Sequence, residues 1–216
     1  LDVGIEIGLF NGILNGNFTY FNRNSYDLLL NVPLSQTTGF TSQVQNIGEL
    51  TNTGFEAEIN VNVVRSEDFN LSVGGNIGTV DNEITKLPLR PDGTERTITT
   101  TRTRIESGHP VNGWYMPTFA GVNPDTGEEE FYIDGKDGPT TTVFNEANPS
   151  WQGGNGVPTL TAGMNLHVDF KNFYVDANGY YATGHKVYDG WHRYTSQPNA
   201  YPIFAFQGLT TLLDRW

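Results

Sequence analysis

The chain contains no cysteine, which excludes a disulfide framework and a thiolate metal site. It also lacks any apolar run near the ~18 residues that a membrane-spanning helix needs, so a helical membrane protein is excluded. Basic residues are scarce, because 12 Lys and Arg stand against 24 Asp and Glu among 216 residues. A nucleic-acid-binding protein needs clustered cations to displace counterions from phosphates. The net charge of -12 therefore excludes DNA and RNA as expected partners.

What the chain has in abundance is glycine, with 25 residues, and segments in which apolar and polar residues alternate. In the clearest segment, Phe55, Ala57, Ile59, Val61 and Val63 alternate with Glu56, Glu58, Asn60 and Asn62. A β-strand points successive side chains to opposite faces, so this segment has one apolar face and one polar face. The alternation predicts an all-β fold.

Six segments show this alternation, and the connections between them run short, long, short, long, short. The expected strands cover 2–10, 13–30, 44–65, 69–85, 158–170 and 173–187. The tight turns are Asn11-Gly12, Ser66-Glu67-Asp68 and Lys171-Asn172. Asn-Gly is the strongest of these turn patterns, because a type I′ hairpin needs two residues that tolerate positive φ.

The long connections cover residues 31–43 and 86–157, and a further long loop is expected over 188–216. Loops as long as 86–157 are rare in compact domains and are usually functional. Within it, Phe131 to Ile133 lead into Asp134-Gly135, which predicts a small hairpin. A short helix is expected over 207–215.

The length of each apolar band decides between a membrane and a soluble fold. Counted from the short turns, the bands span about 7–11 residues, close to the ~9–11 that cross a bilayer as a tilted strand. Aromatic residues lie at both band edges: Phe69, Phe170 and Phe173 near the turns, and Tyr20, Phe55 and Tyr181 at the far rim. This pattern favours an antiparallel transmembrane β-barrel. A soluble β-sandwich or lipocalin-like barrel is the alternative, but its strands usually have only about 5–6 residues.

Three phrases in order resemble one known family: Leu28–Leu34 (LLLNVPL), Thr38–Gln43 (TGFTSQ) and Asn46–Glu56 (NIGELTNTGFE). Supporting phrases are Asn82–Leu87, Gly108–Val111, Gly121–Gly127 and Asp214–Trp216. The chain is similar in these positions to the SusC-type (RagA-like) TonB-dependent transporters of Bacteroidetes outer membranes. The resemblance covers nearly the whole chain.

The resemblance implies that residues 1–216 are a partial barrel domain, an arc of about six strands from the later part of a barrel of about 22 strands. It implies long loops on the extracellular side and a multi-pass location in the Gram-negative outer membrane. It further implies TonB-energised import of oligosaccharides or peptides, with a SusD-like lipoprotein at the extracellular mouth and a plug domain in the lumen. Because Leu1 lies inside an alternating segment, we expect the chain to be an internal piece of a longer protein.

No catalytic constellation is expected, and we predict that the protein is not an enzyme. The four histidines, at 109, 167, 185 and 192, have no helical i, i+4 partner for a metal ion. The predicted ligand-binding residues are loop aromatics: Trp114, Tyr115, Trp151, Tyr188, Trp191 and Tyr194. Flat rings offer large contact area to sugars or peptides at little entropic cost. The alternative is that these rings pack the loops against one another or against the lid protein.

The predicted lumen-facing polar residues are Glu56, Glu58, Asn60, Asn62, Asp169 and Asp176, joined on the same face by Asp2 and Glu6. In a plugged barrel they hydrogen-bond plug groups more often than they touch substrate. Two other functions stay open at this point. One is a secreted soluble carbohydrate-binding β-domain, and the other is a passive outer-membrane porin.

Overall fold

The computed structural model describes residues 1–34, 36–46, 48–90 and 92–191. The chain divides into two compact units, one of Leu1–Met116 with Trp151–His185, the other of Pro117–Ser150 with Lys186–Trp216. No helix among the described residues has the length and hydropathy to cross a membrane. The two short 3₁₀ helices cover Gln36–Thr38 and Phe144–Glu146.

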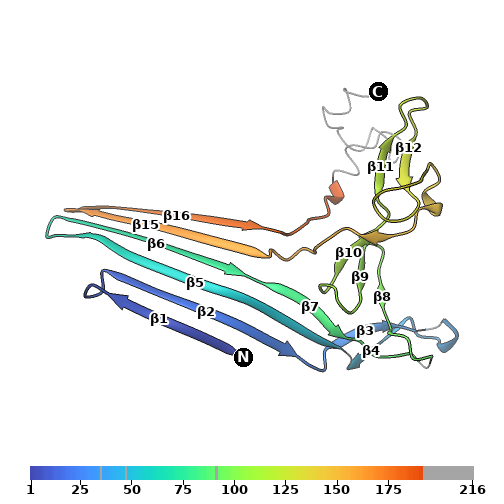
Figure 1. Cartoon of the computed structure of the whole chain (residues 1–216), viewed down its shortest axis with the longest axis horizontal. Helices are drawn as coiled ribbons and strands as arrows, with labels where there is room; N and C mark the ends of the chain where they lie inside the picture. The colour runs from blue at the N-terminus through green and yellow to red at the C-terminus, as the bar shows by residue number, and fades with distance from the viewer. Residues whose placement is uncertain (35, 47, 91, 192–216) are drawn as a thin grey trace. The chain divides into compact units, whose positions relative to one another are not determined.

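The first unit is built on one large antiparallel sheet (Figure 1). Its strand order is β1 (Asp2–Leu9), β2 (Leu14–Ser25), β5 (Glu49–Arg65), β6 (Phe69–Thr79), β15 (Leu160–Phe170) and β16 (Phe173–Thr183), and β7 (Asp81–Lys86) pairs with the first residues of β5. Each strand pairs with the strands next to it in this order, and β1 and β16 do not pair with each other. The sheet is therefore an open arc. The predicted fold class, all-β with antiparallel strands, is confirmed.

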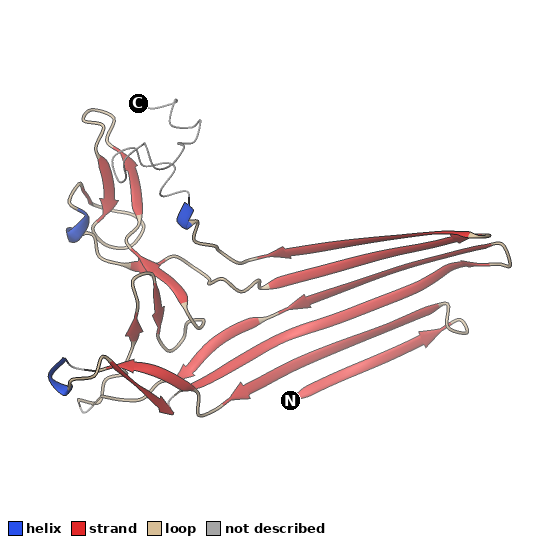
Figure 2. Ribbon diagram, turned by 180° about the vertical axis from the view of Figure 1, so that it is seen from behind, coloured by secondary structure: helices blue, strands red, loops and turns tan. Residues whose placement is uncertain are grey.

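The three tight turns lie at one end of this sheet, where Figure 2 shows the strand pairs closing. In the first turn Asn11 and Gly12 have φ of 55° and 81°, as an Asn-Gly hairpin requires. In the second, the Ser66 hydroxyl accepts a hydrogen bond from the Phe69 amide at 3.0 Å. In the third, Lys171 has φ of 53°. The long connections leave from the opposite end.

The strand register aligns the two parities across the whole sheet. One transverse row is Ile5, Phe18, Ala57, Ile77, Ala162 and Tyr181, and the next row, on the other face, is Glu6, Asn17, Glu58, Asn76, Gly163 and Tyr180. We call these the apolar face and the polar face. The apolar face is open, since Ile5, Ile77 and Tyr181 are 60%, 47% and 58% exposed. An uncovered apolar surface of this extent marks a membrane or protein contact.

The predicted parity fails at one point near the second turn. A register shift lies between Asn62 and Val64, so that Val64 pairs with Leu71. Val63 is the extra residue of this β-bulge, and the regular alternation predicted through Val63 ends there. A bulge leaves one residue of the longer strand unpaired and increases the local twist.

Several predicted strands are longer than the observed ones because the backbone turns within them. The strand expected over 13–30 ends at Ser25, since Asp27 has φ of 57°, and β3 (Leu29–Pro33) then pairs with β4 (Ser42–Asn46) instead of with the main sheet. The strand expected over 44–65 is likewise two strands, separated at Gly48 with φ of 109°. The last strand ends at Thr183, before Gly184 with φ of 82°.

The segment 69–85 also forms two strands, with Val80 between them. At this point the main sheet changes partners. β6 pairs with β15 as far as Thr79, and the Val80 amide donates to the Thr159 carbonyl at 3.0 Å. β7 then continues beside β5 without β15. The remaining first and fifth expected strands, 2–10 and 158–170, are shorter by one residue and two residues at one end.

The insertion, residues 86–157, contains more structure than the single hairpin predicted for it. Its strands in the first unit are β8 (Ile98–Thr99), β9 (Thr103–Ile105) and β10 (Gly113–Met116), and in the second unit β11 (Phe119–Val122), β12 (Glu129–Tyr132) and β13 (Thr140–Thr141) form a small sheet. β14 (Ser150–Trp151) follows, and the Gln152 amide donates to the Trp114 carbonyl beside it.

A small hydrophobic core lies where the insertion leaves the main sheet. Its buried members are Ile84, Leu87, Ile98 and Ile105, with Leu50 and Val111 packed against them. Ile84 and Leu87 are only 3% and 2% exposed. The core therefore attaches the beginning of the insertion to β7 and to the outer end of β5.

Candidate functional site

On the polar face of the sheet lie the side-chain amides of Asn17, Asn60 and Asn165, which we call the amide belt. Two of them bind the carboxylate of Glu58. Glu58 accepts a hydrogen bond from the Asn60 amide nitrogen at 2.7 Å on one oxygen, and from that of Asn17 at 3.3 Å on the other. Gly74 leaves the room that these amides need, because a side chain there would overlap those of Asn60 and Asn165. Glu58 is thus held in a fixed orientation while it stays open to solvent.

Two hollows on the polar face share Glu58 and Asn60. One, of about 480 Å³, is lined by Glu6, Asn15, Asn17, Glu58 and Asn60. The other, of about 260 Å³, is lined by the same two residues with Asn76, Asn165 and Asn178. Both surfaces offer hydrogen-bond donors and acceptors, which suits contact with peptide groups or hydroxyls.

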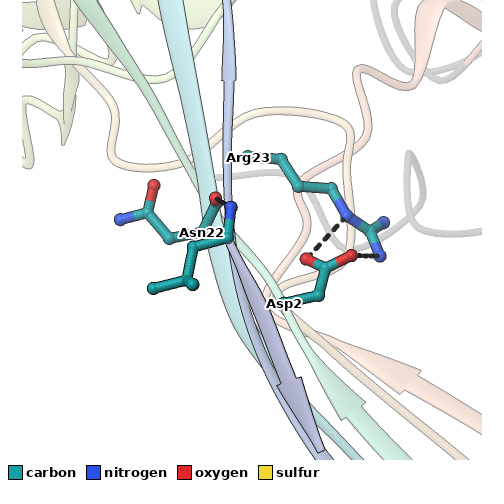
Figure 3. A network of polar contacts seen from close by, with 4 residues as sticks. Asp2, Asn22 and Arg23 are labelled. Carbon is teal, nitrogen blue, oxygen red and sulfur yellow. Dashed lines mark hydrogen bonds and ion pairs between the residues drawn. The ribbon is translucent and has the colours of Figure 1, made fainter.

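Nearer the long-loop end, the polar face has a third hollow of about 330 Å³ that includes Glu56. Arg23 lines the same hollow, and its guanidinium lies 4.8 Å above the Phe21 ring. Figure 3 shows Arg23 paired with Asp2, through Nε at 3.3 Å and Nη2 at 3.2 Å. Both groups are about half exposed, so the pair orients Arg23 more than it stabilises the sheet.

The remaining predicted lumen residues have partners within the sheet. Asp169 and Asp176 both contact the His167 ring, Asp169 at 3.0 Å from Nε2 and Asp176 through Nδ1. Asn62 donates to the Gly12 carbonyl at 3.0 Å and so fastens the first turn to β5. All six predicted residues share the polar face, as the register requires, and Asp169, Asp176 and Asn62, like Glu58 and Asn60, contact other groups of their own sheet.

The aromatic residues predicted to bind ligand divide into two groups. Trp151 stacks on His109 with ring centroids 3.8 Å apart, and Tyr115 meets Trp151 edge-on at 5.2 Å. The Arg104 guanidinium lies 4.8 Å above the Tyr115 ring. For Tyr115 and Trp151 this geometry favours the packing alternative.

The other four predicted aromatic residues differ in exposure, and one of them lies outside the described residues. Trp114 and Tyr188 are half-buried, and Trp191 is 71% exposed. Tyr194 lies outside the described residues, as do His192, the helix expected over 207–215 and the Asp214–Trp216 phrase. Among the residues that the structure describes, no group of three or more His, Asp or Glu side chains is arranged so that it could hold a metal ion.

Sequence reasoning missed Asn82 and Asn155, which hold the base of the insertion together. Asn82 accepts a hydrogen bond from the Val111 amide, 29 residues away, and Asn155 donates to the Val111 carbonyl, 44 residues away. Neither asparagine belongs to a sequence motif of known chemistry. Only the burial of Asn155, at 5% exposure, distinguishes it, and burial of a loop asparagine is decided by the tertiary structure.

An antiparallel sheet with one exposed apolar face, one polar face, tight turns at one end and long loops at the other defines the wall of an outer-membrane β-barrel. Residues 1–105 match the family "TonB dependent receptor-like, beta-barrel". TonB-dependent receptor P3 of Formosa agariphila is 29% identical over 80% of this chain, and SusC of Bacteroides thetaiotaomicron is 38% identical over 40%. The solved structure of the RagAB peptide transporter matches 85% of this chain with a TM-score of 0.76 and 28% identity.

Through the match over residues 1–105, the chain resembles the TonB-dependent receptor β-barrel family, whose members are outer-membrane proteins. The predicted resemblance to SusC-type and RagA-like proteins is confirmed. The chain spans only part of these relatives, 19% of receptor P3, 9% of SusC and 20% of the solved RagAB chain.

Proposed function

We propose that this chain forms part of the wall of an outer-membrane transporter that imports oligosaccharides or peptides, energised through TonB. The observation that carries the proposal is the continuous apolar face of the main sheet. In β16 the apolar parity runs from Phe173 to Tyr181, nine residues in the register of its neighbour. That length agrees with the ~9–11 residues of a bilayer-crossing strand.

The polar face then lines the lumen of a barrel of about 22 strands, the size class whose lumen is plugged. Glu58, which is held by its hydrogen bond from Asn60, and the hollows beside it offer hydrogen-bonding groups to a plug domain or to passing substrate. The loops 86–157 and 188–216 lie on the extracellular side, because transmembrane barrels have short periplasmic turns and long extracellular loops.

A SusD-like lipoprotein is the proposed partner at the extracellular mouth, on the strength of the similarity to SusC and to the RagAB transporter. The proposed substrate class follows the same relatives, since RagAB is a peptide transporter. Trp114, Tyr188, Trp191 and Tyr194 are the aromatic residues that we propose for substrate contact. Tyr115 and Trp151 hold the insertion in place.

The experiment that tests this function uses the full-length protein that carries this sequence. In detergent, the unheated protein should migrate faster on a gel than the boiled protein, as a folded barrel does and a soluble β-domain does not. Cells should accumulate labelled oligopeptides or oligosaccharides only when TonB is present. Uptake that is unchanged without TonB would indicate a passive porin, and a protein recovered in the soluble fraction would contradict the membrane location.

A further inference from the structure

The backbone of Val111 is held from both sides by asparagine side chains of distant segments. Its amide donates to Asn82 Oδ1 at 2.9 Å, and its carbonyl accepts from Asn155 Nδ2 at 3.1 Å. Asn82 Nδ2 donates in turn to Asn52 Oδ1 on β5 at 2.7 Å, and Asn155 Oδ1 accepts from the Val157 amide at 2.9 Å. The backbone of this one residue therefore joins β5, β7 and the end of the insertion.

A ring stack lies next to this peptide. His109 and Trp151 are stacked at 3.8 Å with an angle of 12° between their planes. Gly113 permits the approach of Trp151, because a Cβ there would lie 2.7 Å from Trp151 Cζ3. The His109 carbonyl also accepts from the Ile84 amide at 3.0 Å, and the Gly108 amide donates to the Ile84 carbonyl at 2.9 Å.

We propose that His109, Trp151, Asn82 and Asn155 form an interlock that closes the insertion at its base and positions Trp114. The interlock joins the segment 108–113, on the way out, to the segment 151–157, on the way back, and both to β7. Trp114 directly follows the first segment and is hydrogen-bonded to the second. Its amide donates to the Gly154 carbonyl at 3.1 Å, and its carbonyl accepts from the Gln152 amide at 2.8 Å.

The interlock meets the main sheet at β7, where Asn82 lies opposite Asn52 of β5. None of its four side chains belongs to β1, β2, β6, β15 or β16, and the register of those strands runs without it. A buried asparagine that loses its partners carries a desolvation cost, so the interlock forms or opens as a unit. Opening it frees the base of the insertion while the wall stays folded. The proposed function gives Trp114 its role, but the interlock itself does not depend on that role.

The test is limited digestion of the full-length protein with chymotrypsin, which cleaves after aromatic residues and so reports on the Trp114–Tyr115 segment. His109→Ala and Asn155→Ala should each raise the rate of cleavage after Trp114 or Tyr115 by about tenfold, read from fragment masses. His109→Phe keeps a stacked ring and should restore slow cleavage. His185→Ala and Asn178→Ala, which change a histidine and an asparagine outside the interlock, should cleave at the original rate.

The unheated-gel mobility of each variant must stay that of a folded barrel, which separates this result from failure of the proposed function. Unchanged cleavage in His109→Ala and Asn155→Ala would overturn the proposal, and so would cleavage of His109→Phe as fast as that of His109→Ala. Hydrogen exchange on the unmodified protein covers the case in which the variants do not fold. The Val111 and Trp114 amides should be protected, and exchange there as fast as at exposed loop residues would also overturn the interlock.

Discussion

Apolar side chains meet different surroundings in the main sheet and at the base of the insertion. On the sheet, Ile5, Ile59 and Ile77 are 47–60% exposed and lie in rows that cross every strand. At the base of the insertion, Ile98 and Ile105 are 7% exposed and pack against other apolar side chains. Isoleucine therefore forms part of a surface that needs apolar surroundings in the main sheet, and part of a conventional core at the base of the insertion.

Burial within the chain is therefore a poor guide to how much an apolar side chain contributes to this molecule. In the proposed membrane location a bilayer fills the space beside the exposed residues, so removing a methyl group there leaves no lasting cavity. In the small core the neighbours are fixed, and the cavity stays. The two regions should therefore respond differently to the same substitution.

The largest effect is expected from truncation in the core. Ile105→Ala should cost about 2–5 kcal/mol in the free energy of local opening of the insertion, through lost burial plus a cavity. Ile77→Ala on the apolar face should cost less, because lipid occupies the vacated space. Hydrogen exchange of the two variants in lipid vesicles measures both. Equal costs would contradict the assignment of the sheet face to lipid.

A charge on the apolar face should have the next largest effect. Ile59→Arg should destabilise the folded protein in vesicles by about 2–4 kcal/mol, the range for a charge near the bilayer midplane. Asn60→Arg, the next residue but on the polar face, is the matched control and should cost clearly less. Urea titration followed by gel mobility gives both values, and a reversed order would show that the two faces are assigned wrongly.

Two adjacent glycines give a smaller contrast between the faces. Gly74→Ala should destabilise by about 1–3 kcal/mol, because the added Cβ would overlap the Asn60 and Asn165 side chains. Gly75→Ala meets only the Gly163 carbonyl at 3.4 Å, an ordinary contact, and should be nearly neutral. The same urea titration compares them. A neutral Gly74→Ala would mean that the amide belt can rearrange.

The smallest effect is expected at the exposed pair of Lys86 and Glu49, 3.0 Å apart at the outer end of the sheet. The hydrogen bond to Glu49 raises the pKa of Lys86 above its ordinary 10.5. The pair therefore contributes fully below pH 10.5, and its contribution is lost as the pH rises through the raised pKa. Glu49→Gln should change stability only slightly at pH 7, and high salt should abolish the difference. A large loss would indicate a buried pair.

The sheet could be predicted well from the sequence because its information is local. Alternation and turn residues such as Asn11-Gly12 act within a few positions, and the register follows once the turns are placed. The bulge at Val63 and the break at Asp27 were not predicted. The pattern of apolar and polar residues continues past both positions and gives no sign of either. The local alternation also predicted the polar face, but it did not predict the contact of Asp169 with His167.

The alternation in the sequence was sufficient to assign side chains to the apolar face or the polar face, since the two-residue period of a strand needs no partner to be read. The contacts that the residues of the insertion make follow from the three-dimensional fold alone. The contacts of Val111 with Asn82 and Asn155 span 29 and 44 positions, and no period links them. The sequence leaves open whether Trp151 binds ligand or packs the loops, and the folded chain stacks it on His109. Long-range closure of a loop depends on the geometry of both its ends, and a linear pattern carries no record of that geometry.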